Sequence, residues 1–327
     1  MTHKNYFEIE ADNTYELGLQ KGKLFGESLL QSLNEERKGK VWSEYVRRSR
    51  EYLTPTEKVF PELVAELKGY AHGAGTSFEE LWTLNLLDEL TQDVQEKCTT
   101  FVTNNGFLVA HNEDWSADAE DELCVLKRTI GDATTLELFY VNTLGGNAIS
   151  INSHGILQAI NSLNHYDHQM GIPKCVVARW LSDTSAPERD LEMLGRLRRA
   201  SGFHHVIVNS LGNVWSVECS AKSHIITTPA IPFVHTNHYL MPEMAVLEGN
   251  SNRFGTFGRL SRASENVSET MSIEKARKIL GDSSQGKRRS IHSNRTIGGM
   301  IVDVDHMQAM VWLRRESKKG WLSYEMN

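Results

Sequence analysis

The sequence CTTFVTNNGFLVAHNEDW, residues 98–115, marks the point where the chain changes from helical to strand patterns. Residues 99–103 combine threonine, phenylalanine and valine, which favour strands. Asn104-Asn105-Gly106 is a strong signal for a tight turn, and residues 107–110 resume the strand pattern. The stretch therefore predicts a β-hairpin with Cys98 at the start of its first strand.

The residues before Cys98 are patterned mainly as helices. Thr54-Pro55-Thr56-Glu57 has a capping residue, a proline suited to the first helical position and a glutamate that reaches back. It predicts a helix start, and Gly73 and Gly75 predict where that helix stops. Ser77 begins a second helix by the same capping logic, which we expect to run toward Glu89.

The residues after the hairpin are dominated by strand patterns, with helices inserted among them. We expect strands over residues 136–141, 148–152, 156–160, 205–209, 214–219, 224–228, 297–304 and 309–313, and helices over 174–181, 187–199 and 273–280. The rest of residues 249–295 is polar and rich in turn formers. Runs of helices and runs of strands, without strict alternation, favour a layered α+β fold.

The composition is that of a globular protein, with 24% charged and 40% apolar residues in a chain of 327. The formal net charge of −7 argues against a nucleic-acid partner, which usually needs a clustered basic face. No apolar run is long enough to span a membrane, and residues 1–13 lack a signal-peptide core. Four scattered cysteines without a Cys-x-x-Cys pair predict reduced thiols. We therefore expect a cytoplasmic enzyme, binding protein or scaffold.

Cys98 has two interpretations, as a small buried hydrophobic residue or as a nucleophile, and its neighbours decide between them. Cys98-Thr99-Thr100, the turn at Asn105-Gly106 and the segment His111-Asn112-Glu113-Asp114-Trp115 resemble the isopenicillin-N acyltransferase-like (acyl-coenzyme A:6-aminopenicillanic acid acyltransferase) family of N-terminal-nucleophile cysteine hydrolases. Further segments match in the same order, at residues 69–77, 152–163, 201–203, 235–239 and 295–303. The resemblance extends from about residue 15 to about residue 312.

The resemblance implies a precursor that cuts itself between Lys97 and Cys98. Residues 1–97 would form a helical α-chain and residues 98–327 a β-chain, which stay together as one domain and one heterodimer. The implied fold is a four-layer αββα sandwich, in which two antiparallel sheets lie between helical layers. The new α-amino group of Cys98 would act as the base for its own thiol, because such a group titrates near pH 7.7 to 8.0. The thiol would then form an acyl-thioester with an amide substrate.

The family's functional residues are carried over one at a time. Cys98 would be the nucleophile, and Asp114 would orient the new amino group. The Asn237 side chain would donate to the oxyanion, and Asn161 would add a main-chain N–H. Arg295 would lower the pKa of the thiol or hold a substrate carboxylate. Without the resemblance, these polar residues are equally well explained as turn, strand-end or surface residues.

Three more residues would support this site. Asn112 would hold the same loop as Asp114, and Thr99 and Ser293 would lie close by. Lys97 departs from the family pattern, which commonly has glycine before the cysteine. This departure favours an alternative in which the chain is an uncut, inactive relative that acts as a binding protein.

Two other features are weighed against simpler explanations. The pair His235 and His238 suggests zinc, but no third ligand is evident, so we predict no metal and no cofactor; a metalloenzyme remains a third hypothesis. The acidic residues between 113 and 122 are either a solvated loop or a surface that favours an amine-bearing substrate. The basic run at residues 287–289 is either solvated or in contact with a coenzyme A phosphate.

The function expected from these observations is hydrolysis of a non-peptide or modified-peptide amide. Acyl transfer from a coenzyme A thioester is the alternative, and water is the acceptor that is always present. The partners expected are a small-molecule amide and, for transfer, an acyl-donor thioester. Assembly into a homo-oligomer is left open.

Overall fold

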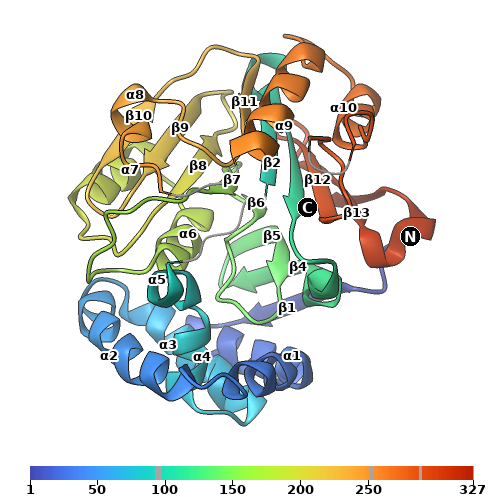
Figure 1. Ribbon diagram of the computed structural model, residues 1–327. Helices are drawn as coiled ribbons and strands as arrows, with labels where there is room; N and C mark the ends of the chain where they lie inside the picture. Colours follow the sequence, from blue (N-terminus) through green and yellow to red (C-terminus); the bar gives the residue numbers. More distant parts are fainter. Residues whose placement is uncertain (93–97, 250–252, 287–288, 327) are drawn as a thin grey trace.

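Two β-sheets lie face to face between two groups of helices in the computed structural model, which describes residues 1–92, 98–249, 253–286 and 289–326 (Figure 1). The eight-stranded sheet has the order β1-β4-β5-β6-β7-β8-β9-β10, and the six-stranded sheet has the order β11-β2-β3-β12-β13-β14. The helices α1–α7 pack on the larger sheet, and α9 and α10 pack on the smaller one. The arrangement confirms the predicted αββα sandwich.

The larger sheet consists of β1 (Tyr6–Ala11), β4 (Leu123–Ile130), β5 (Ala133–Tyr140), β6 (Ile149–Asn152), β7 (Leu157–Ser162), β8 (Phe203–Val208), β9 (Val214–Cys219) and β10 (His224–Thr227). The smaller sheet consists of β11 (Phe233–His235), β2 (Cys98–Thr103), β3 (Leu108–Asp114), β12 (Thr296–Asp303), β13 (Gln308–Leu313) and β14 (Leu322–Glu325). Short 3₁₀ segments are η1 (Asn104–Gly106), η2 (Ala117–Glu122) and η3 (Arg314–Lys319).

The helices are α1 (Thr14–Arg37), α2 (Trp42–Val59), α3 (Pro61–Ala74), α4 (Phe78–Leu84), α5 (Leu87–Thr91), α6 (Lys174–Ser182), α7 (Pro187–Arg196), α8 (Pro242–Ala245), α9 (Arg253–Asn266) and α10 (Ile273–Leu280). None of those within the described ranges is long and apolar enough to cross a membrane.

Apolar layers hold the sandwich together, one between the sheets and one between each sheet and its helices. The middle layer lies between the sheets and contains Val102 and Val109 of the β2–β3 hairpin. The outer layer between the smaller sheet and its helices contains Phe101 and Ala110 of the same hairpin. Successive side chains of a strand point to opposite faces, so the hairpin contributes to both layers. This alternation also distributes the functional side chains described below.

One strand pair departs from the expected antiparallel arrangement. β1 pairs with β4 in parallel, with Tyr6 opposite Val125, and the pairs β2–β3 and β4–β5 are antiparallel. Because the helices α1–α5 separate β1 from β2, no tight hairpin dictates its direction. Residues 1–92 thus supply the edge strand of the larger sheet as well as its helical cover.

Two of the helices expected before Cys98 have other boundaries in the structure. The helix expected to start at Thr54-Pro55 is instead the end of α2, which passes through Pro55 and stops at Val59. Tyr52 and Thr56 are buried on one face of α2, and this packing outweighs the local start signal. The helix expected from Ser77 to Glu89 is divided into α4 and α5. At the break, the Asn85 side chain accepts a hydrogen bond from the Leu144 N–H.

Glycines let α1 and α3 lie against each other backbone to backbone. A Cβ atom at Gly18 would lie 1.9 Å from the main-chain oxygen of Glu66, and one at Gly69 would lie 2.1 Å from that of Tyr15. Any larger residue at these positions would separate the helices. Beside this contact, Lys21 of α1 and Arg179 of α6 both pair with the buried Glu66 of α3.

Candidate active site

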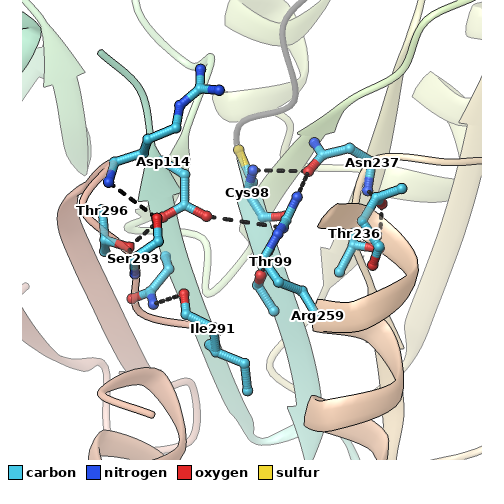
Figure 2. Close-up of polar contacts among 12 residues, drawn as sticks. Cys98, Thr99, Asp114, Thr236, Asn237, Arg259, Ile291, Ser293 and Thr296 are labelled. Carbon is cyan, nitrogen blue, oxygen red and sulfur yellow. Dashed lines mark hydrogen bonds and ion pairs between the residues drawn. The ribbon is translucent and has the colours of Figure 1, made fainter. Parts of the chain in front are cut away.

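Cys98 is the first residue of β2, is 2% exposed and lines a cavity of about 540 Å³. Its main-chain N–H donates a hydrogen bond of 3.1 Å to Asn237 Oδ1. Its carbonyl oxygen accepts a hydrogen bond from the Arg259 guanidinium, which also donates to Asn237 Oδ1 over 2.7 Å. Figure 2 shows these contacts at the start of β2. The main chain of Cys98 is therefore fixed from two sides.

The Cys98 thiol contacts a carboxylate. Cys98 lies directly opposite Glu113 in the β2–β3 register, and its Sγ donates to Glu113 Oε1 over 3.2 Å. The same Oε1 accepts from His111 Nε2 over 2.7 Å, and Oε2 accepts from the Tyr140 hydroxyl over 2.7 Å. Burial and the neighbouring Glu113 raise the pKa of Tyr140 well above its usual range, so its hydroxyl remains a donor.

Asp114 occupies the other face of the hairpin. Its Oδ1 accepts from the Thr296 hydroxyl, and its Oδ2 lies 3.9 Å from Arg259 Nη1 (Figure 2). Burial raises the pKa of Asp114, and Arg259 and Thr296 act against that rise. Asp114 thus reaches the Cys98 main chain through Arg259, while Glu113 contacts the thiol itself.

Asn237 follows β11 and bridges several elements of the site. Its main-chain N–H donates to Thr256 Oγ1 of α9 over 2.8 Å. Its side-chain Nδ2 donates to the carbonyl oxygen of Ser162, at the end of β7, over 3.0 Å. This amide lies beside Cys98, as its predicted role requires, and the oxyanion contact itself stays a prediction.

Asn161 links the two sheets next to Cys98. Its Oδ1 accepts from Thr100 Oγ1 over 3.1 Å and lies 3.2 Å from His204 Nδ1. Thr100 Oγ1 in turn lies 2.8 Å from His111 Nδ1. A chain of polar contacts therefore runs from β7 through β2 to the Glu113 carboxylate. The predicted main-chain contribution of Asn161 to an oxyanion site is not tested by these contacts.

The cavity in front of Cys98 is built from both halves of the chain. Carboxylates dominate its charged lining: Glu35, Glu36, Asp88, Glu89, Glu113, Asp121 and Glu122. Lys174 is the single basic residue among the described residues of the lining, and its Nζ lies 2.7 Å from Asp88 Oδ2. Trp115, Tyr140 and Phe203 add aromatic surface. The cavity thus combines an acidic lining with apolar walls.

A family model described as acyl-coenzyme A:6-aminopenicillanic acid acyl-transferase matches residues 101–300. The chain belongs to this family. The acyl-transferase family match covers the hairpin after Thr100, the strand that ends at Ser162, and the segments that carry Asn237 and Arg259. The predicted resemblance is thereby confirmed.

A curated relative of this acyl-transferase family member is the β-alanyl-dopamine/carcinine hydrolase of Drosophila melanogaster, which is 27% identical over 201 residues. The match covers 52% of this chain, and it spans only about half (52%) of the relative. Two solved structures are also similar, each with 14% identity. A mutant conjugated bile acid hydrolase from Clostridium perfringens gives a TM-score of 0.46 over 71% of this chain and 93% of its own. Penicillin V acylase from Agrobacterium tumefaciens gives 0.45 over 66% and 83%.

The arginine that contacts Cys98 in this acyl-transferase family member is Arg259, which sequence reasoning missed. The role that the resemblance gives to Arg295 near the nucleophile stays a prediction; its carbonyl oxygen accepts from the Trp115 N–H, and its own N–H donates to Ser293 Oγ. α9, which carries Arg259, was also missed, because residues 249–295 were interpreted as mostly turns. Leu260, Ala263 and Val267 follow a helical spacing that could have identified it.

The three supporting residues all lie near the site. Asn112 donates to the carbonyl oxygens of Leu280 and Ile291, at 2.8 and 3.2 Å, and so connects α10 and the following loop to β3. Thr99 Oγ1 accepts from Arg259 over 2.9 Å. The Ser293 N–H donates to Thr296 Oγ1 over 2.9 Å. Lys97, the other half of the expected cleavage site, lies outside the described residues, as do Lys287 and Arg288.

Within the part of the chain that the structure describes, His235 and His238 do not belong to a group of three potential metal ligands. His235 Nε2 lies 3.1 Å from Glu218 Oε1, and His238 Nδ1 lies 2.8 Å from Thr256 Oγ1. Within the described ranges, the one group of three potential ligands is Cys98, His111 and Glu113, with atoms within 4.8 Å of one another. In that group the thiol and the imidazole both already hydrogen-bond to the carboxylate. All four cysteines are free thiols.

Proposed function

We propose that this chain is a cysteine amidohydrolase that cuts itself between Lys97 and Cys98 and then cleaves amides through an acyl-thioester on Cys98. The observation that carries the proposal is the place of Cys98: the thiol lines a cavity large enough for a small molecule, at the start of a strand whose main chain is held by Asn237 and Arg259. Family membership supports the same chemistry.

The contacts of the Cys98 nitrogen suit a change of role on cleavage. In the uncut chain it is an amide N–H that donates to Asn237 Oδ1. Once it becomes an amine, the same acceptor orients it. The nearby Arg259 guanidinium disfavours the protonated amine, and a neutral amine is the form that can take the thiol proton.

The hydrolytic cycle needs no cofactor. The thiol proton moves to the amine as Sγ bonds to the amide carbonyl carbon, and the resulting oxyanion is stabilised by donors placed beside it. The C–N bond then breaks, and the leaving amine takes the proton. Water attacks the acyl-thioester, which releases a carboxylic acid and restores the thiol. Asn237 Nδ2 is the side-chain donor beside Cys98 that we assign to the oxyanion.

The acidic lining favours substrates with a positive charge. Glu36 illustrates the environment, because partial burial raises the pKa of its carboxyl group. The negative potential of the acidic lining would attract a cationic group. The Drosophila relative is named for β-alanyl-dopamine, and a β-alanyl group ends in a primary amine. We therefore propose that the substrates are amides that carry an amino group, and that water is the acceptor of the acyl group.

A matched set of chromogenic amides tests this function. The p-nitroanilides of β-alanine, butyrate and succinate share the scissile bond and differ in the charge at the far end of the acyl group. We expect cleavage by the wild-type chain but not by Cys98→Ala, and a kcat/KM at least tenfold higher for the β-alanyl than for the succinyl compound. Equal rates would refute the charge preference.

The alternatives give different results in the same assay. A coenzyme A-dependent transferase would release p-nitroaniline faster when coenzyme A is added as acceptor. A metalloenzyme would lose activity with a chelator and contain stoichiometric metal. An uncut binding protein would cleave none of the compounds, and calorimetry with the β-alanyl compound would still detect binding.

A further inference from the structure

The proposed self-cleavage requires a base that the uncut chain must supply from a side chain. Before cleavage the Cys98 nitrogen is part of a peptide bond, and its hydrogen is donated to Asn237 Oδ1. An amide nitrogen has no basic lone pair. The α-amino group that serves later therefore cannot remove the thiol proton in the first step.

Glu113 is placed to meet this need. The thiol already donates to Glu113 Oε1 over 3.2 Å, and both residues are almost fully buried. We propose that the Glu113 carboxylate accepts the proton of the Cys98 thiol in the self-cleavage step; this assignment rests on the proposed function. It gives the enzyme one base for processing and a second, the α-amine, for turnover.

The surroundings of Glu113 fix its geometry. His111 Nε2 donates to the same oxygen as the thiol, and the Tyr140 hydroxyl holds the other oxygen. Because residues 111 and 113 point to the same face of β3, the register of the hairpin aligns both with Cys98. Asp114 points to the opposite face and is occupied by Thr296 and Arg259. Glu113, not Asp114, is therefore the carboxylate in contact with the thiol.

The step balances without any external reagent except water. The thiol proton moves to Glu113 as Sγ bonds to the carbonyl carbon of Lys97. The tetrahedral intermediate collapses with cleavage of the C–N bond, and the proton passes from Glu113 to the departing Cys98 nitrogen. This leaves a thioester and a free α-amine. Water then hydrolyses the thioester to give the Lys97 carboxyl group and the free thiol.

A thiol is an intrinsically weaker acid than a carboxylic acid, so complete transfer of its proton to a carboxylate before attack is unfavourable. We therefore expect proton transfer to Glu113 to accompany the attack of Sγ. General base catalysis of this kind typically contributes about 10²- to 10⁴-fold. Removal of the carboxylate charge should slow processing by that order and leave hydroxide as the remaining base.

The test compares processing rates of full-length Glu113→Gln and the wild-type chain by intact mass. We expect Glu113→Gln to split at least 100-fold more slowly, at a rate that rises about tenfold per pH unit. Glu316→Gln is the matched control, since Glu316 is also a buried, hydrogen-bonded carboxylate but does not line the cavity. Should Glu113→Gln fail to fold, Glu113→Asp keeps the charge, moves it away from Sγ and is expected to slow splitting at least tenfold.

A second measurement separates processing from turnover. The changes Val94→Asp, Gln95→Asp and Glu96→Asp create Asp-Asp-Asp-Asp-Lys at residues 93–97, which enteropeptidase cuts after the lysine, so that Cys98 becomes the N-terminus. In the chain cut by enteropeptidase, the fold decrease in kcat caused by Glu113→Gln should be at least tenfold smaller than the fold decrease in the rate of self-cleavage that it causes in the uncut chain. Splitting of Glu113→Gln at the wild-type rate overturns the role of Glu113 alone. A wild-type chain that never splits overturns the proposed self-cleavage, and this assignment with it.

Discussion

Cys98 and Glu113 lie directly opposite each other in the β2–β3 hairpin, and the thiol of one donates a hydrogen bond to the carboxylate of the other. The turn at Asn104–Gly106 sets this register. The same register places Asp114 on the far face, with Arg259 between it and the Cys98 main chain. One hairpin therefore separates the groups around the thiol from those around the nitrogen.

The identity of the nucleophile is the first prediction. Cys98→Ala should abolish both splitting and amide turnover, because no other thiol occupies the start of β2. Cys124→Ala is the control: Cys124 is fully buried between the larger sheet and its helices. Its loss should cost some stability and leave turnover within about twofold. Steady-state kinetics and intact mass check both. Full turnover in Cys98→Ala would exclude the mechanism.

Substitution of Arg259 and of Arg295 should affect kcat/KM to different extents. Arg259→Gln removes charged hydrogen bonds to the Cys98 carbonyl and Asn237, each typically worth about 1.5–3 kcal/mol, so kcat/KM should fall at least 100-fold. Arg295→Gln should change it by less than about threefold. Circular dichroism checks that both variants fold. A larger loss in Arg295→Gln than in Arg259→Gln would instead support the role that the resemblance gives to Arg295.

Asn237→Ala should lower kcat by about 100-fold, the equivalent of about 3 kcal/mol for a lost oxyanion donor. KM should change much less, because the interaction is made in the transition state. Asn213→Ala, in the exposed turn between β8 and β9, serves as the control. A pure rise in KM would show that Asn237 binds substrate without stabilising the oxyanion.

The two chains should stay associated after cleavage. β1 pairs with β4 across the proposed cut, and Glu66 before it pairs with the buried Arg179 after it over 2.9 Å. Breaking a buried pair by removing one partner costs about 3–5 kcal/mol. Native mass spectrometry should therefore give the sum of both chains. Release of residues 1–97 under native conditions would contradict this account, because residues of that chain also line the cavity.

Stability should fall in acid because of buried histidines. Burial and Arg199 lower the pKa of His205 to about 3. Between pH 6.5, the ordinary pKa of histidine, and pH 3, this side chain is protonated in the unfolded chain but neutral in the folded chain. The contribution of neutral His205 to the free energy of unfolding is therefore fully present above pH 6.5 and declines as the pH falls. His205→Gln should reduce the slope of unfolding free energy against pH by up to about 1.4 kcal/mol per unit. Urea titrations between pH 7 and 5 measure it, with the exposed His154→Gln as control; an unchanged slope would refute the prediction.

Local patterns predicted the hairpin and most later strands correctly. The pattern of residues 99–103 and the turn after them correctly placed Cys98 at the start of a strand. The bounds of α10 were also predicted correctly. The parallel pairing of β1 was not predictable, since it depends on a partner more than a hundred residues away. The passage of α2 through Pro55 was missed for a related reason, because buried packing outweighed a local signal.

The candidate site was only partly predictable. Motif resemblance drew attention to Asp114, the last residue of β3, and to Arg295, the residue directly before β12. Glu113 was overlooked, although its place opposite Cys98 follows from the hairpin register alone. Arg259 required recognition of α9, whose serine, arginine and glycine content hides a short apolar face. Glu113 and Arg259 were therefore identified only from contacts between segments that are distant in the sequence, which short motifs do not reveal.

The most direct test of the central claim is the intact mass of the purified wild-type chain under denaturing conditions, followed by sequencing of the larger product. The account predicts two chains, residues 1–97 and 98–327, with Cys98 at the start of the second. A single chain of 327 residues that remains unbroken on long incubation, with no amide turnover, would contradict it.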